Sequence, residues 1–386
     1  MGACVAVIST LETKAVESHY LAQRLEAYGL LVRHIDVSLK AGERLADAKL
    51  DAMTKAVEAG TDECLALHGE GCLVFVGVGG GTGSELIVRL MRALPPTYPK
   101  ILATTLPFDP RAALADSSVI IVPTLADVAG LNPLMRDTFE TVAAMTAGLC
   151  ARQIAPVAAN SKRSVALTAL GATDAAVAQL LPKLEAAGYD VTVFHSNGYG
   201  GSAYARFVTD GMFDAVIDMT PHELTRMMLG GAHVAMPTRF SAGIAAGLSP
   251  IVLPGALNFV GLGAPDTIPD IYLNRPHYRH SSHFTHVQVT PGEMESLAMA
   301  LIANLNDAQS ATLIIPMGGF SHQDAPGGAI EAPELRHVFR DVVMRAANPS
   351  VTIIETDAHI GDTETALCTL KALARHVELR KETKNA

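Results

Sequence analysis

The sequence predicts an α/β protein built of two Rossmann-like subdomains, each a mostly parallel sheet with helices on both faces. Short apolar runs typical of buried strands alternate with longer segments whose apolar residues recur at helical spacing. Glycines close several of the helical segments, and the alternation restarts near residue 164. The length of 386 residues also fits two domains. We therefore expect a nucleotide-binding subdomain over 1–160 and a second subdomain with a small-ligand site over 161–386.

The elements follow in chain order. The run 4–9 (CVAVIS) is a buried strand, the amphipathic segment 15–28 is a helix ending at Gly29, and 45–59 is a helix closed by Gly60. Further strands of the first subdomain are expected at 31–37, 73–78, 101–105 and 119–122, and further helices at 84–94 and 134–152. In the second subdomain, strands are expected at 165–170, 190–195, 214–218, 251–253, 312–316 and 351–355, and helices at 174–187, 203–210, 222–229, 291–307, 333–347 and 363–380. Such alternation produces parallel sheets.

Composition excludes several classes of function. Asp and Glu total 39 against 29 Lys and Arg, so no basic excess is present to neutralise a nucleic-acid backbone. The uncharged segment 240–265 is broken by Pro250, Pro254 and several glycines, which argues against a membrane span. We expect no signal peptide and a cytoplasmic protein. The five cysteines show no CxxC spacing, so we expect idle thiols in a reducing compartment.

A glycine-rich loop follows the apolar run 73–78 and precedes an amphipathic helix. Glycines there let a ligand approach the backbone, and a helix N-terminus supplies free N–H groups for an anion. The loop lacks the Lys-Ser/Thr pair of a P-loop and also fails G-x-G-x-x-G. We expect a phosphate cradle, and the alternative is a turn needed only for tight packing. Its residues are Gly77, Gly79, Gly80, Gly81, Thr82, Gly83 and Ser84.

The turn after the first strand carries Thr10, Thr13 and Lys14. At the carboxyl end of a parallel strand, these hydroxyls and the ammonium group would lie beside the glycine loop and could bind phosphate oxygens. The alternative is helix capping by a threonine, with Lys14 in solvent.

A second glycine loop follows the strand that ends at His195, and it contains Gly198, Gly200 and Gly201. We expect the backbone N–H groups of Gly200 and Gly201 to bind a carboxylate or phosphate, although a simple turn is an equal alternative. Acidic and imidazole groups also follow predicted strands of this half, where they could transfer protons or hold Mg²⁺. Capping and loop hydrogen bonds are the other interpretation. The candidate catalytic residues are Glu223, Asp324, Asp357 and His359.

Four histidines recur at every third residue: His277, His280, His283 and His286. A period of three suits neither a strand face nor a helix face, so we favour a polar loop over a metal site.

Several motifs, in chain order, resemble those of the ATP-binding domain family named after the tomato tobamovirus-resistance protein, whose bacterial members are uncharacterised. The matching segments are 10–14, 77–84, 127–132, 193–195 with 198–201, 254–257, 324–328 and 357–360. The resemblance implies that the first subdomain holds ATP, with Asp127 and Asn132 near the same crevice and Mg²⁺ bridging the phosphates. It also implies a dimer, which the high apolar content favours. Of the four histidines in 277–286, the resemblance implies a functional role for His280.

The sequence departs from the family pattern at three positions of the second half. Gln288 and Gly318 stand where arginines are usual, and Asn258 stands where aspartate is usual. We therefore expect a ligand with one carboxylate, or a neutral carbonyl compound. The function that follows is an ATP-binding enzyme acting on such a metabolite, and the alternative is a non-catalytic, nucleotide-dependent binding protein.

Overall fold

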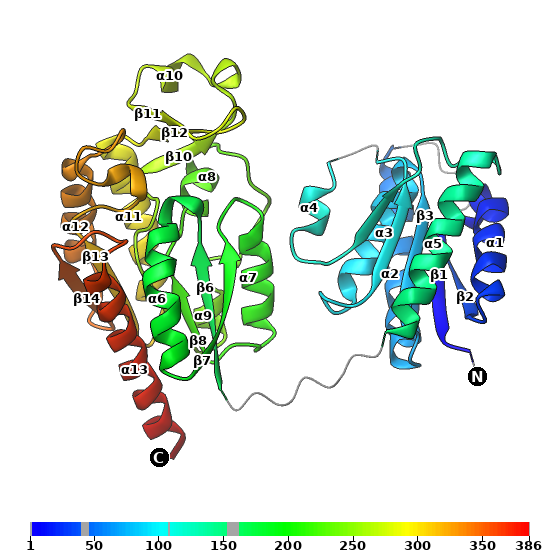
Figure 1. The fold of residues 1–386 in the computed structure, drawn as a ribbon, viewed down its shortest axis with the longest axis horizontal. Coiled ribbons are helices and arrows are strands. Elements are labelled where there is room, and N and C mark those ends of the chain that lie inside the picture. Colours follow the sequence, from blue (N-terminus) through cyan, green and yellow to red (C-terminus); the bar gives the residue numbers. More distant parts are fainter. Residues whose placement is uncertain (1, 40–45, 107–108, 153–161, 386) are drawn as a thin grey trace. The chain divides into compact units, whose positions relative to one another are not determined.

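The computed structural model describes residues 2–39, 46–106, 109–152 and 162–385. The chain divides into two compact units, Met1–Ala158 (unit 1) and Ala159–Ala386 (unit 2). Each unit has its own parallel sheet with helices on both faces, as predicted (Figure 1). The expected boundary between residues 160 and 161 lies outside the described residues.

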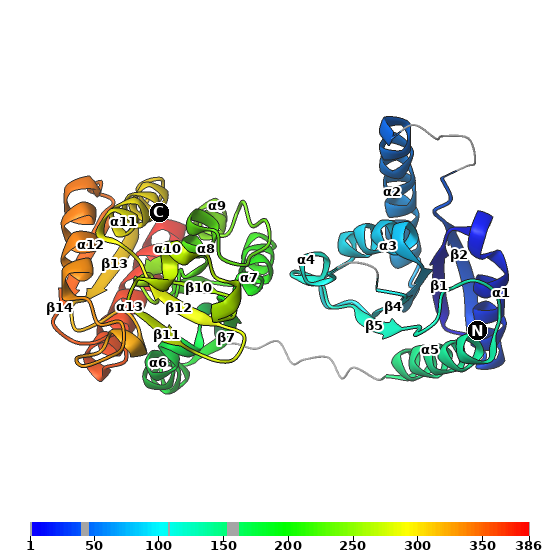
Figure 2. The same ribbon diagram turned by 90° about the horizontal axis from the view of Figure 1, so that it is seen from above.

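Unit 1 is a five-stranded parallel sheet. Its strands, in sheet order, are β2 (Leu31–Asp36), β1 (Cys4–Ser9), β3 (Val74–Gly79), β4 (Lys100–Thr104) and β5 (Ile120–Pro123). Because side chains alternate along each strand, β1 and β3 present apolar residues to both faces. One face packs against α1 (Leu11–Ala27) and α5 (Pro133–Ala151), and the other against α2 (Ala46–Gly69) and α3 (Gly81–Ala93) (Figure 2). The short α4 spans Arg111–Leu114.

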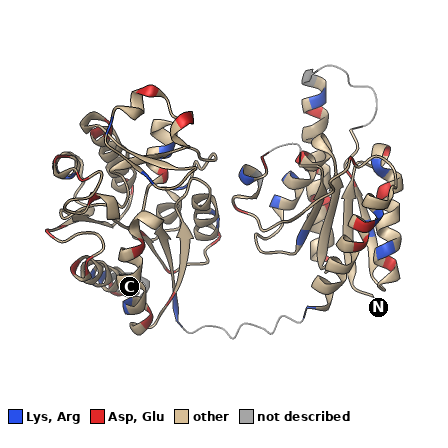
Figure 3. Cartoon of the chain, turned by 45° about the horizontal axis from the view of Figure 1, so that its top comes forward, with Lys and Arg blue, Asp and Glu red and all other residues tan. Residues whose placement is uncertain are grey.

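Unit 2 contains a six-stranded parallel sheet. Its strands, in sheet order, are β14 (Val351–Thr356), β13 (Ala311–Pro316), β9 (Ile251–Val252), β8 (Ala215–Asp218), β6 (Arg163–Ala169) and β7 (Tyr189–His195). One face packs against α6 (Asp174–Ala186) and α13 (Thr363–Asn385). The other packs against α7 (Gly200–Thr209), α9 (Ala242–Ala245), α11 (Pro291–Asn306) and α12 (Pro333–Ala346). Charged side chains of both units lie mainly on helices and loops (Figure 3).

A small antiparallel sheet in unit 2 is absent from the sequence-based prediction. It consists of β10 (Phe259–Leu262), β12 (Thr285–Gln288) and β11 (His277–Arg279), in that order, and β10 packs against α8 (Glu223–Leu229). The short α10 (Asp270–Leu273) lies between β10 and β11. The expectation of a polar loop is therefore wrong for His277 and His286, which lie in strands. No helix in the described part of the chain is long and apolar enough to cross a membrane.

The cysteines also differ from expectation. Cys4 and Cys72 form a disulfide that joins the start of β1 to the segment before β3, so idle thiols were the wrong interpretation for this pair. Among the described residues, Cys64, Cys150 and Cys368 are free. Burial raises the pKa of the Cys64 thiol to about 12, which keeps it protonated and unreactive.

Candidate functional site

The glycine loop and the turn after β1 lie together in unit 1. The chain passes from β1 to β2 on one side and then to β3 on the other side of β1, so the strand order reverses between β1 and β3. Open parallel sheets bind ligands at the carboxyl ends of strands that flank such a reversal. A Cβ atom on Gly83 would lie 3.8 Å from the Thr10 side chain, which places the two segments side by side.

The glycines of this loop serve two different purposes. A Cβ atom on Gly79 would lie 2.8 Å from the backbone nitrogen of Ser84, and one on Gly77 would overlap Ile87, so both glycines are needed for packing. A Cβ atom on Gly80 would meet no protein atom within 4 Å. Helix α3 begins at the next residue and has no acidic side chain in its first turn. The first N–H groups of α3 lack intrahelical partners, and among the described residues no atom lies within 4 Å of a Cβ position at Gly80.

The N-terminus of α1 is occupied by protein groups. The N–H groups of Leu11 and Glu12 donate to the Asp36 carboxylate and to the Ser38 hydroxyl, at 3.0 and 2.9 Å. The Thr10 and Thr13 hydroxyls are 2.9 Å apart. Within the described ranges, by contrast, no side chain accepts a hydrogen bond from the first N–H groups of α3, and the Thr10 hydroxyl lies beside its first turn.

Lys14 and the segment 127–132 are tied to each other. The Lys14 ammonium donates to the Val128 carbonyl, and the Gly130 N–H donates to the Glu17 carboxylate at 2.5 Å. Asn132 caps α5 by accepting from the Met135 N–H at 3.0 Å, so its side chain has a structural role. Asp127 is exposed in the same segment. The structure therefore brings Lys14 and this segment together through a hydrogen bond to the Val128 carbonyl.

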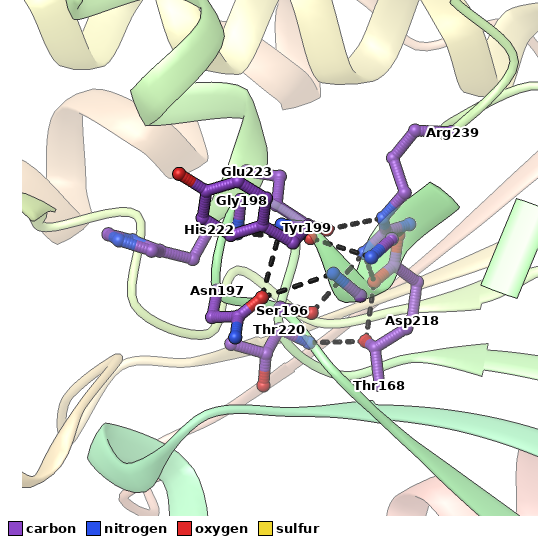
Figure 4. A network of polar contacts seen from close by, with 12 residues as sticks. Thr168, Ser196, Asn197, Gly198, Tyr199, Asp218, Thr220, His222, Glu223 and Arg239 are labelled. Carbon is purple, nitrogen blue, oxygen red and sulfur yellow. Dashed lines mark hydrogen bonds and ion pairs between the residues drawn. The ribbon is translucent and has the colours of Figure 1, made fainter. Parts of the chain in front are cut away.

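Unit 2 contains a buried ion-pair network at the carboxyl ends of β6 and β8 (Figure 4). Arg239 is 1% exposed and makes a bidentate ion pair with Asp218, at 2.8 and 2.9 Å. Its Nε also donates to Glu223 at 2.6 Å. Thr168 donates to the Asp218 carboxylate at 2.6 Å. We call Arg239, Asp218 and Glu223 the Arg239 network.

The second glycine loop packs against this network. The N–H groups that we expected to bind a ligand anion donate to side chains of the protein instead. The Gly201 N–H donates to Glu223 at 2.8 Å, and the Gly200 N–H donates to Asn197 at 3.1 Å. Gly198 has a φ of +93°, which favours glycine, and its N–H also faces Glu223, at 3.3 Å. The protein's own side chains thus fill the seat that we expected a substrate oxyanion to occupy.

Two other candidate catalytic residues, Asp324 and His359, are held by contacts within their own loops. Asp324 is fully buried and accepts from the N–H groups of Phe320 and Ala332, at 2.9 Å each, although burial raises the pKa of its carboxyl. His359 lies near Asp324 and has both ring nitrogens engaged, by the Ser321 carbonyl at 2.9 Å and the Gly361 N–H at 3.0 Å. These bonds are the capping and loop contacts of the alternative interpretation.

The remaining candidates lie at the surface or away from this group. Asp357 is exposed after β14, and His280 is exposed after β11. Gly318 packs against the backbone of residues 357–359, so the arginine usual at this position would not fit this backbone. No group of three or more His, Cys, Asp or Glu residues within the described ranges is placed to hold a metal ion.

A column of stacked rings runs from the interior of unit 2 to its surface. The His222 and Phe259 ring centroids are 4.7 Å apart, and the His286 ring stacks on Phe259 at 4.1 Å. The exposed His280 ring stacks on His286 at 4.8 Å. Sequence reasoning missed His222 and Arg239, because their partners come from distant segments.

Two family models match the chain. The C-terminal domain of the uncharacterised protein family UPF0261 matches residues 162–377, and its N-terminal domain matches residues 42–155. This chain belongs to the UPF0261 family. The two family domains fall in unit 2 and unit 1 respectively.

Relatives within UPF0261 occur in bacteria and in tomato. A UPF0261 protein of Mesorhizobium japonicum is 29% identical over 400 residues, covering 98% of this chain and 99% of that protein. A UPF0261 protein of Rhizobium meliloti is 31% identical over 350 residues, covering 85% of this chain and 87% of that protein. The tomato (Solanum lycopersicum) ToMV resistance protein Tm-1 is 27% identical over 340 residues, covering 84% of this chain and 45% of that protein.

Proposed function

We propose that unit 1 binds an adenine nucleotide, with ATP as the ligand and Mg²⁺ bridging its phosphates. The observation that carries the proposal is the free N-terminus of α3 at the strand-order reversal between β1 and β3. Free helix N–H groups and the helix dipole favour a phosphate there, and the open approach at Gly80 admits one. Thr10 and Thr13 would supply hydroxyl donors beside the phosphate. The exposed Asp127 would supply a carboxylate toward the bound Mg²⁺. Calorimetry with ATP and Mg²⁺ tests the proposal, and no binding at millimolar nucleotide contradicts it.

Replacing Gly80 by valine should weaken nucleotide binding without unfolding unit 1. The added side chain would enter the space in front of α3. The backbone φ of −82° is open to L-residues, but the ψ of −148° lies outside their usual regions, so stability is measured beside affinity. We expect affinity to fall by at least about tenfold, because the phosphate can no longer approach the N–H groups. The measurement is the ATP dissociation constant, with the melting temperature followed in parallel.

Gly148→Val is the matched control. Gly148 also has open space at its Cβ position, but it lies near the far end of α5 from Asn132. This variant should bind ATP as the unaltered chain does. Equal affinity of the Gly80 and Gly148 variants would place the nucleotide elsewhere.

Beyond nucleotide binding, we propose an enzyme that acts on a small carboxylate or carbonyl metabolite, with nucleotide as substrate or regulator. The alternative is a non-catalytic, nucleotide-dependent binding protein, which the virus-resistance name of the tomato relative favours. Nucleotide turnover stimulated by one metabolite supports the enzyme. Saturable nucleotide binding without turnover across a broad metabolite panel supports the binding protein. The cytoplasmic location stays a prediction.

The protein should assemble as a symmetric homodimer or a larger symmetric oligomer. Large apolar side chains lie on the surface of both units, including Leu125 at 92% and Ile271 at 67% exposed. Exposed apolar side chains that gather into a patch favour association of copies. Light scattering at micromolar concentration should give at least twice the chain mass of 40.5 kDa, and a mass of 40.5 kDa would contradict assembly.

A further inference from the structure

Three buried polar side chains of unit 2 meet at Gly261, outside the Arg239 network. His222 precedes α8, Arg226 lies within α8, and His286 lies on β12; their exposed fractions are 0%, 6% and 5%. A Cβ atom on Gly261 would lie 2.6 Å from Nη2 of Arg226 and 3.2 Å from Nε2 of His222. His286 is the register partner of Gly261, so its side chain leaves the small sheet on the same face. Figure 4 shows the His222 ring pointing away from the Arg239 network.

These side chains lack the partners that buried polar groups usually have. Within the part of the chain that the structure describes, Nε of Arg226, Nε2 of His222 and Nδ1 of His286 accept or donate no hydrogen bond. Buried polar atoms without partners are uncommon and call for a specific explanation, such as a ligand.

Arg226 is the more unusual because no carboxylate in the described ranges forms an ion pair with it. Its Nη1 donates only to the Ala232 carbonyl, at 2.9 Å. Glu223 lies one helical turn earlier, but its oxygens are taken by Arg239 and by the N–H groups of the glycine loop. Arg239, by contrast, forms ion pairs with two carboxylates, so the Arg239 network carries one net negative charge. The Glu223 charge partly offsets the lowering of the Arg226 pKa by burial, but within the described residues no carboxylate oxygen accepts a hydrogen bond from the guanidinium. Nε of Arg226 is therefore a buried donor that the carboxylate of a ligand could fill.

The His222 ring is held as a hydrogen-bond acceptor. Its Nδ1 lies 2.8 Å from the Ala256 carbonyl, so the proton is on Nδ1 and the lone pair is on Nε2. Ala256 has a φ of +57°, a conformation that is strained for a residue other than glycine. Burial, followed by the charge of Arg226, keeps the pKa of His222 well below its ordinary value. The ring therefore stays neutral near pH 7 and presents Nε2 to a donor.

We propose that Arg226 and His222 form a binding site for a small 2-hydroxy carboxylate. The guanidinium would bind the carboxylate, and the ligand hydroxyl would donate to Nε2 of His222. This inference rests on the proposed small-molecule role of unit 2 and is independent of nucleotide binding in unit 1.

The charges of the site select this class of ligand over two others. A metal ion would be repelled by the guanidinium, although imidazoles are good metal ligands. A dianionic phosphate would be matched by one guanidinium only, with two neutral imidazoles around it. A single carboxylate with a neighbouring hydroxyl matches one cation and one acceptor. Nη1 of Arg226 donates a hydrogen bond to the carbonyl of Ala232, which is an exposed residue. The guanidinium therefore lies just beneath the surface.

Binding of glycolate and acetate to the full chain, measured by ligand-observed NMR without nucleotide, tests the site. The unaltered chain should bind both, with glycolate about tenfold more tightly because only glycolate carries the hydroxyl. Arg226→Gln should weaken both ligands by at least about tenfold, through loss of the charged hydrogen bond. His222→Phe should keep the acetate affinity and remove the preference for glycolate, while the new ring retains the stack on Phe259.

Two further variants keep the test decisive. Arg279→Gln removes an exposed arginine of the same small sheet and should leave both affinities unchanged. Arg226→Lys keeps the positive charge and should retain part of the acetate affinity if Arg226→Gln fails to fold. The proposal is overturned if the unaltered chain binds neither acid at millimolar concentration, or if Arg226→Gln binds them unchanged. Saturable binding without turnover supports this site while contradicting the proposed enzyme.

Discussion

The Arg239→Met variant should lose about 3–5 kcal/mol of the unfolding free energy of unit 2. Removing the guanidinium leaves Asp218 and Glu223 as buried carboxylates without their cation. Methionine retains apolar volume against the Tyr204 and Phe240 rings, on which the guanidinium stacks at 4.7 and 4.8 Å. The loss should therefore report the uncompensated charge. Because the chain lacks tryptophan, hydrogen exchange in β6 and β8 is the suitable measurement.

Two comparisons isolate that cause. Arg345→Met breaks an exposed ion pair with Glu295, whose side chains are 66% and 58% exposed, and should cost no more than about 1 kcal/mol. Adding Asp218→Asn and Glu223→Gln to Arg239→Met should restore part of the lost stability, since the buried charges are then removed together. If Arg239→Met were as mild as Arg345→Met, the network would not stabilise unit 2 as we infer.

Acid should destabilise unit 2 through its buried histidines. Burial, followed by the neighbouring His280 and Arg226, lowers the pKa of His286 to about 3, and burial also lowers that of His222. In the unfolded chain both rings take up a proton near pH 6.5. Between pH 6.5 and about 3, the unfolded state therefore binds more protons than the folded state. For His286 the unfolding free energy should fall by about 1.4 kcal/mol per pH unit over this window, and His222 should add a fall in the same direction.

His286→Phe provides the test of this pH dependence. Phenylalanine can keep the stacks on Phe259 and His280 but cannot take up a proton. Unfolding of the two chains, compared at pH 7, 6, 5 and 4 by hydrogen exchange, should show a pH slope smaller by about one proton in the variant. Asp324, whose raised pKa acts in the opposite direction, is common to both chains and cancels. Identical slopes would mean that His286 is protonated in the folded protein.

Much of unit 1 follows from the sequence because its signals are local. An apolar run, a glycine loop and an amphipathic segment predicted β3, the loop and α3, although the helix begins at Gly81 rather than at Ser84. The turn after β1 was placed near the loop from the general geometry of parallel sheets, and Thr10 does lie beside Gly83. The role of Asn132 could be assigned only from the structure. An asparagine that caps a helix and an asparagine that binds a ligand cannot be told apart in the sequence.

The small sheet of unit 2 was missed because its three strands are short and two of them, β11 and β12, are rich in polar residues. β11 and β12 contain His277 and His286, and their pairing depends on β10, which is far along the chain. Neither segment shows the long alternation of apolar and polar residues that marks a half-buried strand. The ring column and the position of Gly261 against Arg226 exist only once these strands pair.

The sequence by itself determined the two parallel-sheet units and the glycine loop between β3 and α3, because helical and strand periods are local properties of the chain. The tertiary structure decided which polar groups meet. Glu223 lies 16 residues from Arg239 and closes a buried ion pair instead of facing a substrate. Arg226, three residues further along α8, forms no ion pair with a carboxylate of the described residues and donates to the Ala232 carbonyl. The different partners of Glu223 and Arg226 could not be read from the sequence, because burial and the distance to a counterion are properties of the folded chain.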